Sequence, residues 1–214
     1  MRENVALRRA LVTGGAGFIG SRVVRDLLAR GMEVTVLDDL STGRREAVPA
    51  GAGLVEGDVR SEADVRAGLD GADAVFHLAA KVSVRDSFDR FYEDADTNIL
   101  GTANVLRCLE PGVVRRFVLA SSMAVYDESG PGRTVSEDHP CRPLSPYGVG
   151  KRTAEQLAEQ VLAHKHIDFT TLRYFNTFGP GQRFTPYVGV ITIFINRLLA
   201  GEAPVVFGDG MQRR

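Results

Sequence analysis

A tyrosine lies four residues before a lysine in the segment Tyr147-Gly148-Val149-Gly150-Lys151. Side chains four residues apart share one face of an α-helix, so the ammonium of Lys151 can lie close to the phenol of Tyr147. A nearby cation favours the phenolate and lowers a phenol pKa that otherwise lies near ~10. Such a phenol can take a proton from an alcohol near neutral pH. Most pairs of this kind are ordinary surface residues, so the interpretation depends on the rest of the chain.

The elements that would position this pair alternate between short apolar runs and helical patterns. The continuous apolar runs are typical of parallel strands covered on both faces. Strands are expected at residues 10–13, 33–37, 53–56, 74–79, 117–121 and 169–174. Helices are expected at residues 21–30, 62–69, 97–109 and 146–164. This alternation predicts an α/β fold, a Rossmann-type doubly wound parallel sheet.

The last part of the chain has a different pattern. Residues 190–200 are predicted to form an amphipathic helix, and residues 204–210 a short strand and a turn, before the sequence stops at Arg214. Nothing in this stretch resembles a domain that completes its core. We therefore expect a Rossmann domain over residues 1–176, only the beginning of a small substrate-binding domain over residues 177–214, and a truncated chain.

The composition excludes several classes of protein. The 26 basic and 27 acidic residues are interspersed, so no electrostatic footprint for nucleic acid or an anionic membrane is present. The cysteines, Cys108 and Cys141, have the spacing of neither a disulfide framework nor a metal site. No apolar run reaches the ~18 residues of a spanning helix. We expect a soluble, cytoplasmic protein with no metal and no nucleic-acid or membrane partner.

A glycine-rich turn, Thr13-Gly14-Gly15-Ala16-Gly17-Phe18-Ile19-Gly20, follows the first predicted strand and opens the first predicted helix. Glycines there permit a tight turn, close approach of a pyrophosphate to backbone N–H groups, and close packing of helix on strand. Asp38 ends the second strand 18 residues beyond Gly20, where a carboxylate can bind adenine-ribose hydroxyls. A carboxylate there repels a 2′-phosphate, which favours NAD over NADP. The alternative is that Asp38-Asp39 is a solvated turn.

Two further strand ends fit a bound nucleotide. Asp58-Val59 follows the third strand, where an adenine could lie against backbone and an apolar side chain. The small residues of His77-Leu78-Ala79-Ala80 close the fourth strand and would let a nucleotide approach closely. His77 could be a catalytic base, but we interpret it as a structural histidine at a strand end.

Together with Ser122, Tyr147 and Lys151, these motifs resemble the extended short-chain dehydrogenase/reductase family. Within that family the chain is similar to the NAD-dependent nucleotide-sugar epimerases and dehydratases, the UDP-galactose 4-epimerase group. The resemblance runs over essentially the whole chain, and several separate motifs occur in the right order. It implies NAD as the cofactor and a nucleotide sugar, expected to be a UDP-sugar, as the substrate.

The resemblance also implies which residues contact the cofactor. Asn98 matches the asparagine that supports the site, and the alternative is an ordinary polar residue near a helix start. The implied cofactor-binding residues are Gly14, Gly17, Phe18, Ile19, Gly20, Asp38, Asp39, Thr42, Gly43, Asp58, Val59, Leu78, Ala79, Ala80, Asn98, Tyr147, Lys151 and Tyr174.

Three residues are implied to be catalytic: Ser122, Tyr147 and Lys151. Tyr147 would be the base, Ser122 would hydrogen-bond the sugar hydroxyl, and Lys151 would bind the nicotinamide ribose while holding the phenol acidic. The implied substrate-binding residues are Ser122, Tyr147 and Asn176. The family reaction would oxidise the sugar C4 hydroxyl to a ketone and return the hydride to the opposite face, so tightly held NAD would suffice.

The residues after Ser122 help to choose among the family's reactions. Dehydratases carry an Asp-Glu pair where this chain has Met123-Ala124, and decarboxylases usually have a glutamate there, so 4-epimerisation is favoured. Asp127 and Gly150 depart from the family's usual glycine and serine. A nucleotide-sugar dehydratase, decarboxylase or reductase is the alternative enzyme, and a truncated NAD-binding remnant without turnover is the alternative of a different class.

An oligomeric state also follows from the resemblance. The predicted helices at residues 97–109 and 146–164 form the dimer interface in the family. We therefore expect a homodimer.

Overall fold

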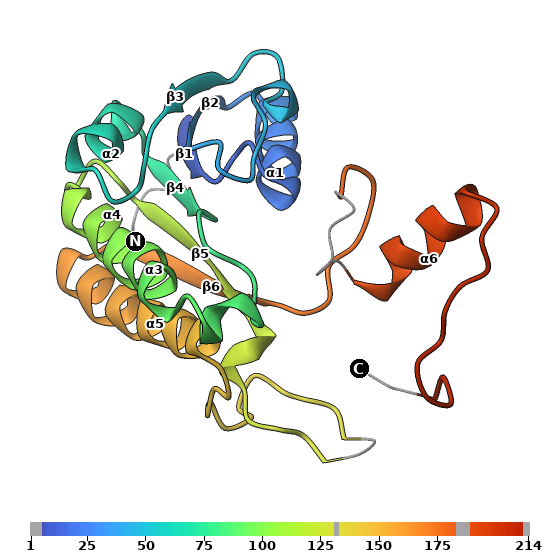
Figure 1. The fold of residues 1–214 in the computed structure, drawn as a ribbon. Helices are drawn as coiled ribbons and strands as arrows, with labels where there is room; N and C mark the ends of the chain where they lie inside the picture. The colour runs from blue at the N-terminus through green and yellow to red at the C-terminus, as the bar shows by residue number, and fades with distance from the viewer. Residues whose placement is uncertain (1–5, 131–132, 183–188, 212–214) are drawn as a thin grey trace.

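The computed structural model describes residues 6–130, 133–182 and 189–211. Six strands in these residues form one parallel sheet in the order β3-β2-β1-β4-β5-β6 (Figure 1). The strands are β1 (Arg9–Thr13), β2 (Glu33–Asp38), β3 (Gly53–Glu56), β4 (Ala74–His77), β5 (Arg116–Ser122) and β6 (Asp168–Tyr174). The strand order reverses between β1 and β4, and ligands of such sheets bind at the carboxyl ends of the strands there. The predicted Rossmann-type sheet is confirmed.

The helices alternate with the strands as the sequence predicts. They are α1 (Phe18–Ala29), α2 (Glu62–Leu69), α3 (Phe91–Ala95), α4 (Thr102–Cys108), α5 (Pro146–Lys165) and α6 (Val190–Leu199). Short single turns occur at η1 (Arg45–Ala47), η2 (Asp86–Phe88) and η4 (Met123–Val125). The helix expected at residues 97–109 begins earlier, because α3 continues into α4 through a π-helical stretch, η3 (Asp96–Gly101). Such stretches are rare and are frequent at functional sites.

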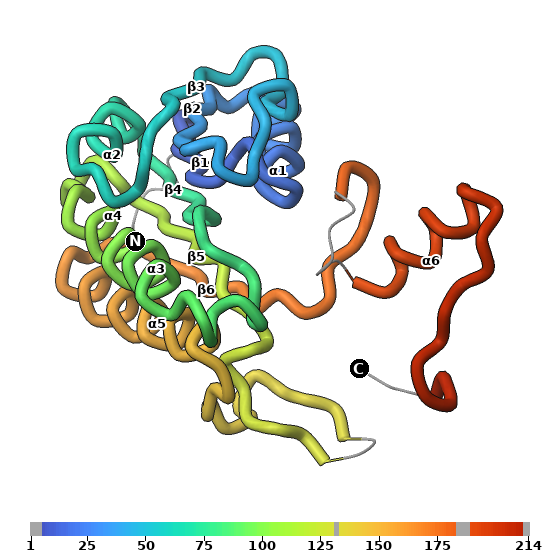
Figure 2. The backbone as a smooth tube through the Cα atoms, viewed as in Figure 1, coloured from blue at the N-terminus to red at the C-terminus, as the bar shows by residue number. Residues whose placement is uncertain are grey.

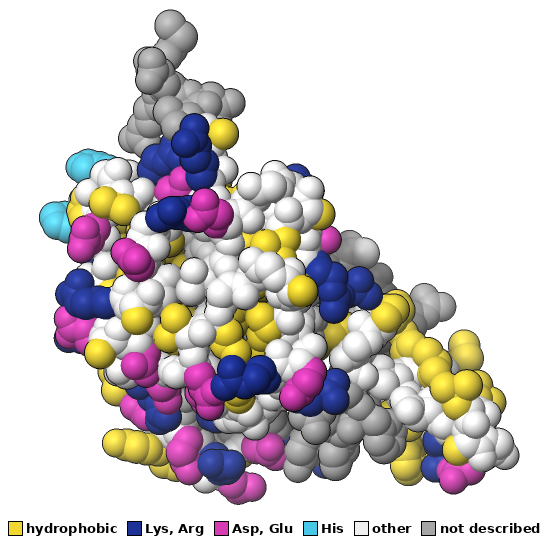
Figure 3. Space-filling model, turned by 90° about the horizontal axis from the view of Figure 1, so that it is seen from above, with side chains coloured by type: hydrophobic (Ala, Val, Ile, Leu, Met, Phe, Trp, Pro, Cys, Tyr) yellow, Lys and Arg dark blue, Asp and Glu magenta, His cyan; other side chains and the backbone are white. Residues whose placement is uncertain are grey.

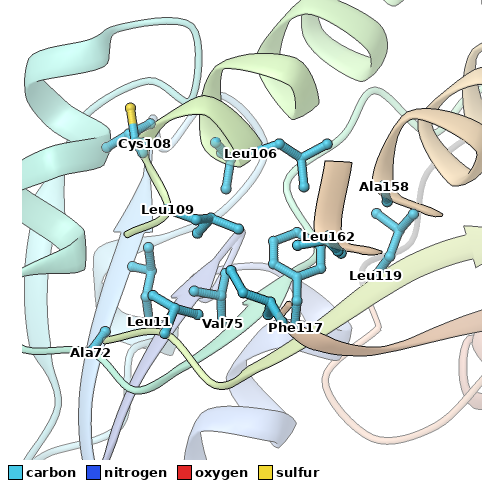
Figure 4. Packing of buried hydrophobic residues seen from close by; sticks show 14 of the residues in the cluster. Leu11, Ala72, Val75, Leu106, Cys108, Leu109, Phe117, Leu119, Ala158 and Leu162 are labelled. Atoms are coloured by element: carbon cyan, nitrogen blue, oxygen red, sulfur yellow. The ribbon is translucent and has the colours of Figure 1, made fainter. Parts of the chain in front are cut away.

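The core is divided by the sheet into two clusters. Successive strand residues point to opposite faces, so Leu11 and Val12 of β1 belong to different clusters. Leu11 belongs to the cluster that also contains Leu106 of α4 and Leu162 of α5 (Figure 4). Val12 packs with Val24 of α1 on the other face. This burial fixes the helices on the sheet and holds the carboxyl ends of the strands in register.

The tail follows a separate course. After β6 the chain leaves the sheet and leads to α6, which lies to one side of the other helices (Figure 2). None of the residues of α6 is buried. The short strand expected within residues 204–210 is wrong, because none of these residues belongs to a strand in the described part of the chain. An isolated extended segment gains no ladder hydrogen bonds. The turn expected after it is present at residues 208–210.

Candidate functional site

The glycine turn between β1 and α1 forms a close-packed cradle. Gly14 has a φ of +70°, and a Cβ added to it would lie 2.8 Å from the backbone nitrogen of Ala79. A Cβ on Gly20 would collide with the carbonyl oxygen of Gly14. Gly17, at the N-cap of α1, has no side chain with which to cap the helix. The first-turn amides, including those of Phe18 and Ile19, are therefore at a helix end suited to a phosphate.

Asp38 ends β2 beside this cradle. Its carboxylate accepts hydrogen bonds from the backbone N–H groups of Ala16 and Leu40, each at 2.9 Å. Burial raises the pKa of Asp38 and outweighs the two hydrogen bonds, which lower it. The backbone at Gly43 also comes close, since an added Cβ would lie 2.9 Å from Oδ1 of Asp38. Asp38 is therefore a buried carboxylate whose position is set by the loop around it.

The neighbouring residues Asp39 and Thr42 lie further out. Asp39 is exposed, and its Oδ1 accepts hydrogen bonds from the backbone and the hydroxyl of Ser41, at 2.9 and 2.7 Å. Thr42 is exposed as well. The interpretation as a solvated turn therefore fits Asp39 but is wrong for Asp38.

The ends of β3 and β4 close the same side of the site. Asp58 binds Arg60 through both carboxylate oxygens, and this hydrogen bonding lowers the pKa of Asp58. Val59 is buried, and its carbonyl oxygen accepts a 2.7 Å hydrogen bond from Asn104. The backbone N–H groups of Leu78 and Ala79 bond the hydroxyl of Thr13, which draws the end of β4 against the glycine turn. Ala80 follows, half-buried.

His77 is structural, as interpreted from the sequence. Its Nδ1 lies 2.7 Å from the hydroxyl of Thr13, and its Nε2 lies 3.0 Å from the hydroxyl of Thr102. Both ring nitrogens are thus used in linking β1, β4 and α4. Burial, and secondarily the charge of Lys151, lower the pKa of His77 to about 3.

At the other end of the site, α5 carries Tyr147 and Lys151. Ser145 caps this helix by accepting a hydrogen bond from the backbone of Gly148 at 3.1 Å, and Pro146 is favourable at the first helical position. The backbone N–H of Tyr147 donates to the hydroxyl of Ser87 at 3.1 Å. A Cβ on Gly148 would meet the carbonyl oxygen of Ala124, so the first turn of α5 packs directly on the segment that follows Ser122.

Ser122 and Tyr147 are brought together by this packing, and the hydroxyl of Ser122 is close enough to the phenol to act on its pKa. Ser122 also accepts a hydrogen bond from the backbone of Ala124 at 3.2 Å, which fixes its hydroxyl at the start of η4. The expectation of a lowered phenol pKa is wrong for this structure. Burial raises the pKa of Tyr147, the nearby hydroxyl of Ser122 lowers it, and the charge of Asp94 raises it further.

Lys151 lies one turn beyond Tyr147 and is buried. Its Nζ donates a 3.0 Å hydrogen bond to the carbonyl oxygen of Ala120. Burial lowers the pKa of Lys151 to about 8, while the carboxylates of Asp94 and Glu155 act in the opposite direction. The pair thus has the expected helical spacing, but the ammonium is held by the end of β5.

Asn98 lies in the π-helical stretch and is buried. Its amide oxygen accepts from the backbone N–H of Lys81 at 2.9 Å, and its amide nitrogen donates to the carbonyl of Lys81 and to Asp94, each at 3.0 Å. The interpretation as an ordinary polar residue at a helix start does not fit this reciprocal arrangement, which ties η3 to the chain after β4.

Asp94 is a residue that the sequence analysis missed. It is buried, and its charge acts on both Lys151 and Tyr147. Burial raises the pKa of Asp94, against a hydrogen bond from Asn98 and the charge of Lys151. Its position four residues before Asn98 was the available signal, because that spacing places both side chains on one face of a helix.

The remaining predicted residues follow β6. Tyr174 is the register partner of Ser122 across β5 and β6, and burial raises the pKa of its phenol. Asn176 is exposed just beyond the end of this strand. The structure thus brings Tyr174 to the site and places Asn176 at its outer edge.

Charge and hydropathy complete the description. On the face shown in Figure 3, basic and acidic side chains are interspersed. In the described part of the chain, no cluster of three or more histidine, cysteine, aspartate or glutamate side chains could hold a metal ion. No helix among the described residues is both long enough and apolar enough to cross a membrane.

Residues 10–214 match the sequence profile of the NAD dependent epimerase/dehydratase family. A UDP-glucose 4-epimerase of Mycolicibacterium smegmatis is 37% identical over 212 residues, which cover 96% of this chain and 68% of the relative. A UDP-N-acetyl-alpha-D-glucosaminuronate decarboxylase of Bacillus cytotoxicus is 32% identical and is matched over 97% of this chain and 66% of its own length.

A solved structure is also similar. The UDP-glucose 4-epimerase of Thermus thermophilus, in complex with NAD, superimposes with a TM-score of 0.85 at 40% identity. The match covers 91% of this chain and 63% of that one. The chain therefore spans about two thirds of the length of the proteins it matches.

Proposed function

Because the chain belongs to the NAD dependent epimerase/dehydratase family, we propose that it is an NAD-dependent nucleotide-sugar 4-epimerase. The observation that carries this proposal is the packing of the first turn of α5, which bears Tyr147 with Lys151 one turn further along, on the segment that begins at Ser122. These three side chains stand at the carboxyl ends of the strands, on the same edge of the sheet as Asp38 and the glycine turn.

The glycine turn and Asp38 fit a dinucleotide. Gly14, Gly17 and Gly20 leave room for a pyrophosphate at the start of α1, and the buried carboxylate of Asp38 suits the adenine ribose. When bound, NAD would accept a hydride from the sugar and return it. We propose that Val59, Leu78, Ala79 and Tyr174 line the remaining cofactor surface, and that Asp39 and Thr42 stand at its rim.

The chain's own residues would move the proton. Tyr147 would accept it from the C4 hydroxyl, and Ser122 would hydrogen-bond the same hydroxyl and align it with the phenol. Lys151, held by Ala120, would bind the nicotinamide ribose and place a positive charge near the phenolate as it forms. In this structure the ammonium is held by Ala120, and the pKa of the phenol is set by burial, Ser122 and Asp94.

The residues after Ser122 favour epimerisation over the alternatives. Met123 and Ala124, the first residues of η4, cannot exchange protons with a sugar. A dehydratase needs residues that can exchange protons with the sugar in order to eliminate water. Dehydration is therefore less favoured here than epimerisation. We propose a UDP-sugar as the substrate, with residues 1–176 as the NAD-binding domain and residues 177–214 as the beginning of a substrate-binding domain in which Asn176 lies at the boundary.

The experiment that tests this proposal follows the configuration of the sugar at C4. The 214-residue protein is incubated with UDP-glucose, UDP-N-acetylglucosamine or UDP-glucuronate without added NAD, and inversion at C4 is followed by NMR. Replacing Tyr147 by Phe should lower the rate by roughly 10² to 10⁴ because proton transfer is lost, while bound NAD is retained. Tyr92→Phe is the matched control, because Tyr92 is exposed on α3.

Each alternative has its own outcome in the same assay. A 4-keto-6-deoxy sugar would identify a dehydratase, and loss of carbon dioxide from UDP-glucuronate would identify a decarboxylase. Protein that retains NAD but turns over none of the three sugars would be the remnant, and the epimerase proposal would be abandoned.

We further propose a homodimer that forms through α3, η3 and α5. A groove of about 520 Å³ lies between these helices, and its lining includes Phe88, Phe91, Leu144 and Val149. These four apolar side chains are between 48% and 62% exposed, an unusual concentration for a free surface. A second copy of the chain would bury them in an isologous interface.

The free thiols of Cys108 and Cys141 accord with a cytoplasmic location, which we also propose.

A further inference from the structure

Glu155 lies one turn beyond Lys151 on α5 and is almost completely buried. The side chain is 4% exposed, yet it is charged, since hydrogen bonds from Arg173, Ser121 and Arg152 outweigh the effect of burial and lower its pKa. A buried carboxylate is costly unless its oxygens are paired. The catalytic roles proposed above do not use this residue.

The partners of Glu155 come from two adjacent strands. The hydroxyl of Ser121 in β5 donates to Oε1 at 2.5 Å. Arg173 in β6 donates to Oε1 and Oε2, each at 2.9 Å, in a bidentate pair. Ser121 and Arg173 are register partners across the two strands, so one carboxylate closes a triangle between β5, β6 and α5.

The triangle lies directly behind the catalytic residues. Ser121 immediately precedes Ser122, and Arg173 immediately precedes Tyr174. The guanidinium of Arg173 also stacks over the ring of Tyr126, 4.8 Å from its centroid, just after η4. Glu155 thus accepts hydrogen bonds from Ser121 and Arg173, the residues that immediately precede Ser122 on β5 and Tyr174 on β6.

We propose that Glu155 is a positioning residue, which sets the distance between Ser122 on β5 and Tyr147 on α5 and keeps Tyr174 in register with both. This inference rests on the proposed function for its kinetic consequence. Its geometric content concerns the free protein. Among the described residues, the bond from Ser121 to Glu155 and the bond from Lys151 to Ala120 are the side-chain hydrogen bonds that join α5 to β5 here, so loss of Glu155 leaves that of Lys151. A displacement of about 1 Å can cost about 100-fold in rate.

Two variants, one that removes and one that weakens a single hydrogen bond to Glu155, separate positioning from simple stabilisation. Ser121→Ala removes the bond that links α5 to β5. Arg152→Gln weakens a bond of similar length, 2.8 Å, that joins two residues of the same helix. We expect Ser121→Ala to lower kcat about 10-fold with KM for the UDP-sugar nearly unchanged, and Arg152→Gln to leave both within about twofold. Equal kinetics in the two variants would overturn the proposal.

A second readout needs no substrate. The Cζ carbon of Tyr147 is followed by NMR in protein with ¹³C-labelled tyrosine, and its signal is assigned by its loss in Tyr147→Phe. Because the nearby hydroxyl of Ser122 lowers the pKa of this phenol, a displaced Ser122 should raise that pKa. We expect a rise in Ser121→Ala and in Glu155→Gln, and none in Arg152→Gln. An unchanged Tyr147 titration in folded Ser121→Ala would rule the proposal out.

The two readouts also distinguish failure of the proposed function from failure of this inference. If the wild-type protein epimerises none of the sugars, the function is wrong, but the Tyr147 titration still tests the role of Glu155. Should Glu155→Gln fail to fold, Ser121→Ala carries the test alone, because it keeps the carboxylate and both arginines and removes only a hydroxyl.

Discussion

Asp94 shows how a single buried charge shapes the reacting end. Its carboxylate bonds Asn98 at 3.0 Å and raises the pKa of both Tyr147 and Lys151. A phenol that is buried and faces a carboxylate stays protonated to higher pH than a free one. At the residue scale, the surroundings of Tyr147 therefore favour the protonated phenol over the phenolate. The positive charge of Lys151 does not reverse this preference.

The first prediction concerns Asp94→Asn. Removing the negative charge should lower the pKa of Tyr147 and also that of Lys151, which is about 8 in the wild type. If the phenolate is the base, activity appears as pH rises through the Tyr147 pKa, so the acidic limb of kcat/KM should move to lower pH.

The control for this variant is Asp96→Asn, the same substitution two residues further along. Asp96 pairs with Arg60 at 2.6 Å and does not contribute to the pKa of either catalytic residue. Its pH profile should match that of the wild type. A profile of Asp94→Asn that stays in place, or moves to higher pH, would show that Asp94 does not tune the site.

At the element scale, the contact between α5 and the segment after β5 decides where Tyr147 stands. Gly148 makes this contact possible, since a Cβ would meet the carbonyl oxygen of Ala124 and lie 2.9 Å from Pro143. Alanine is otherwise the better helix former by roughly 1 kcal/mol. Helix propensity therefore predicts that Gly148→Ala stabilises the protein, whereas packing predicts that the same substitution destabilises it.

We predict that packing prevails in Gly148→Ala. The variant should be destabilised by about 1–3 kcal/mol, as overpacking usually costs, and should lose most of its epimerase activity because α5 is pushed from Ser122. Urea unfolding followed by circular dichroism measures the first effect, and the NMR assay the second. Gly130→Ala is the control, because nothing lies within 4 Å of the added Cβ. A Gly148→Ala variant that is more stable than the wild type and fully active would contradict this prediction. It would show that α5 and the segment at Ala124 can move apart without cost.

At the scale of the whole molecule, the exposed groove between α3, η3 and α5 carries the dimer proposal. Phe91, 61% exposed, stands at its edge. We predict that Phe91→Glu converts the dimer to a monomer in light scattering, because a buried unpaired charge disrupts an apolar interface. Val113→Glu adds the same charge at an exposed valine outside the groove lining and should leave the mass unchanged. A monomeric wild-type protein would refute the dimer itself.

The fold could be predicted from the sequence because its signals are local. Apolar runs and helical periodicity indicated the strands and most helix limits, and the glycine turn with Asp38 indicated the nucleotide end. Where a prediction failed, the cause was a partner distant in sequence. Residues 204–206 have strand composition but no strand beside them in the described part of the chain, and η3 joins α3 to α4 although its π-helical geometry has no sequence period.

By itself, the sequence determined the order of the elements, the spacing of Tyr147 and Lys151, and the proximity of the glycines to a strand end. Only the tertiary structure decided the electrostatics of the site. Burial raised the phenol pKa, α3 brought Asp94 to the site, and Glu155 joined two strands to α5. Spacing along a helix is fixed by local geometry, whereas a pKa depends on every charge and every desolvated surface that folding brings within reach.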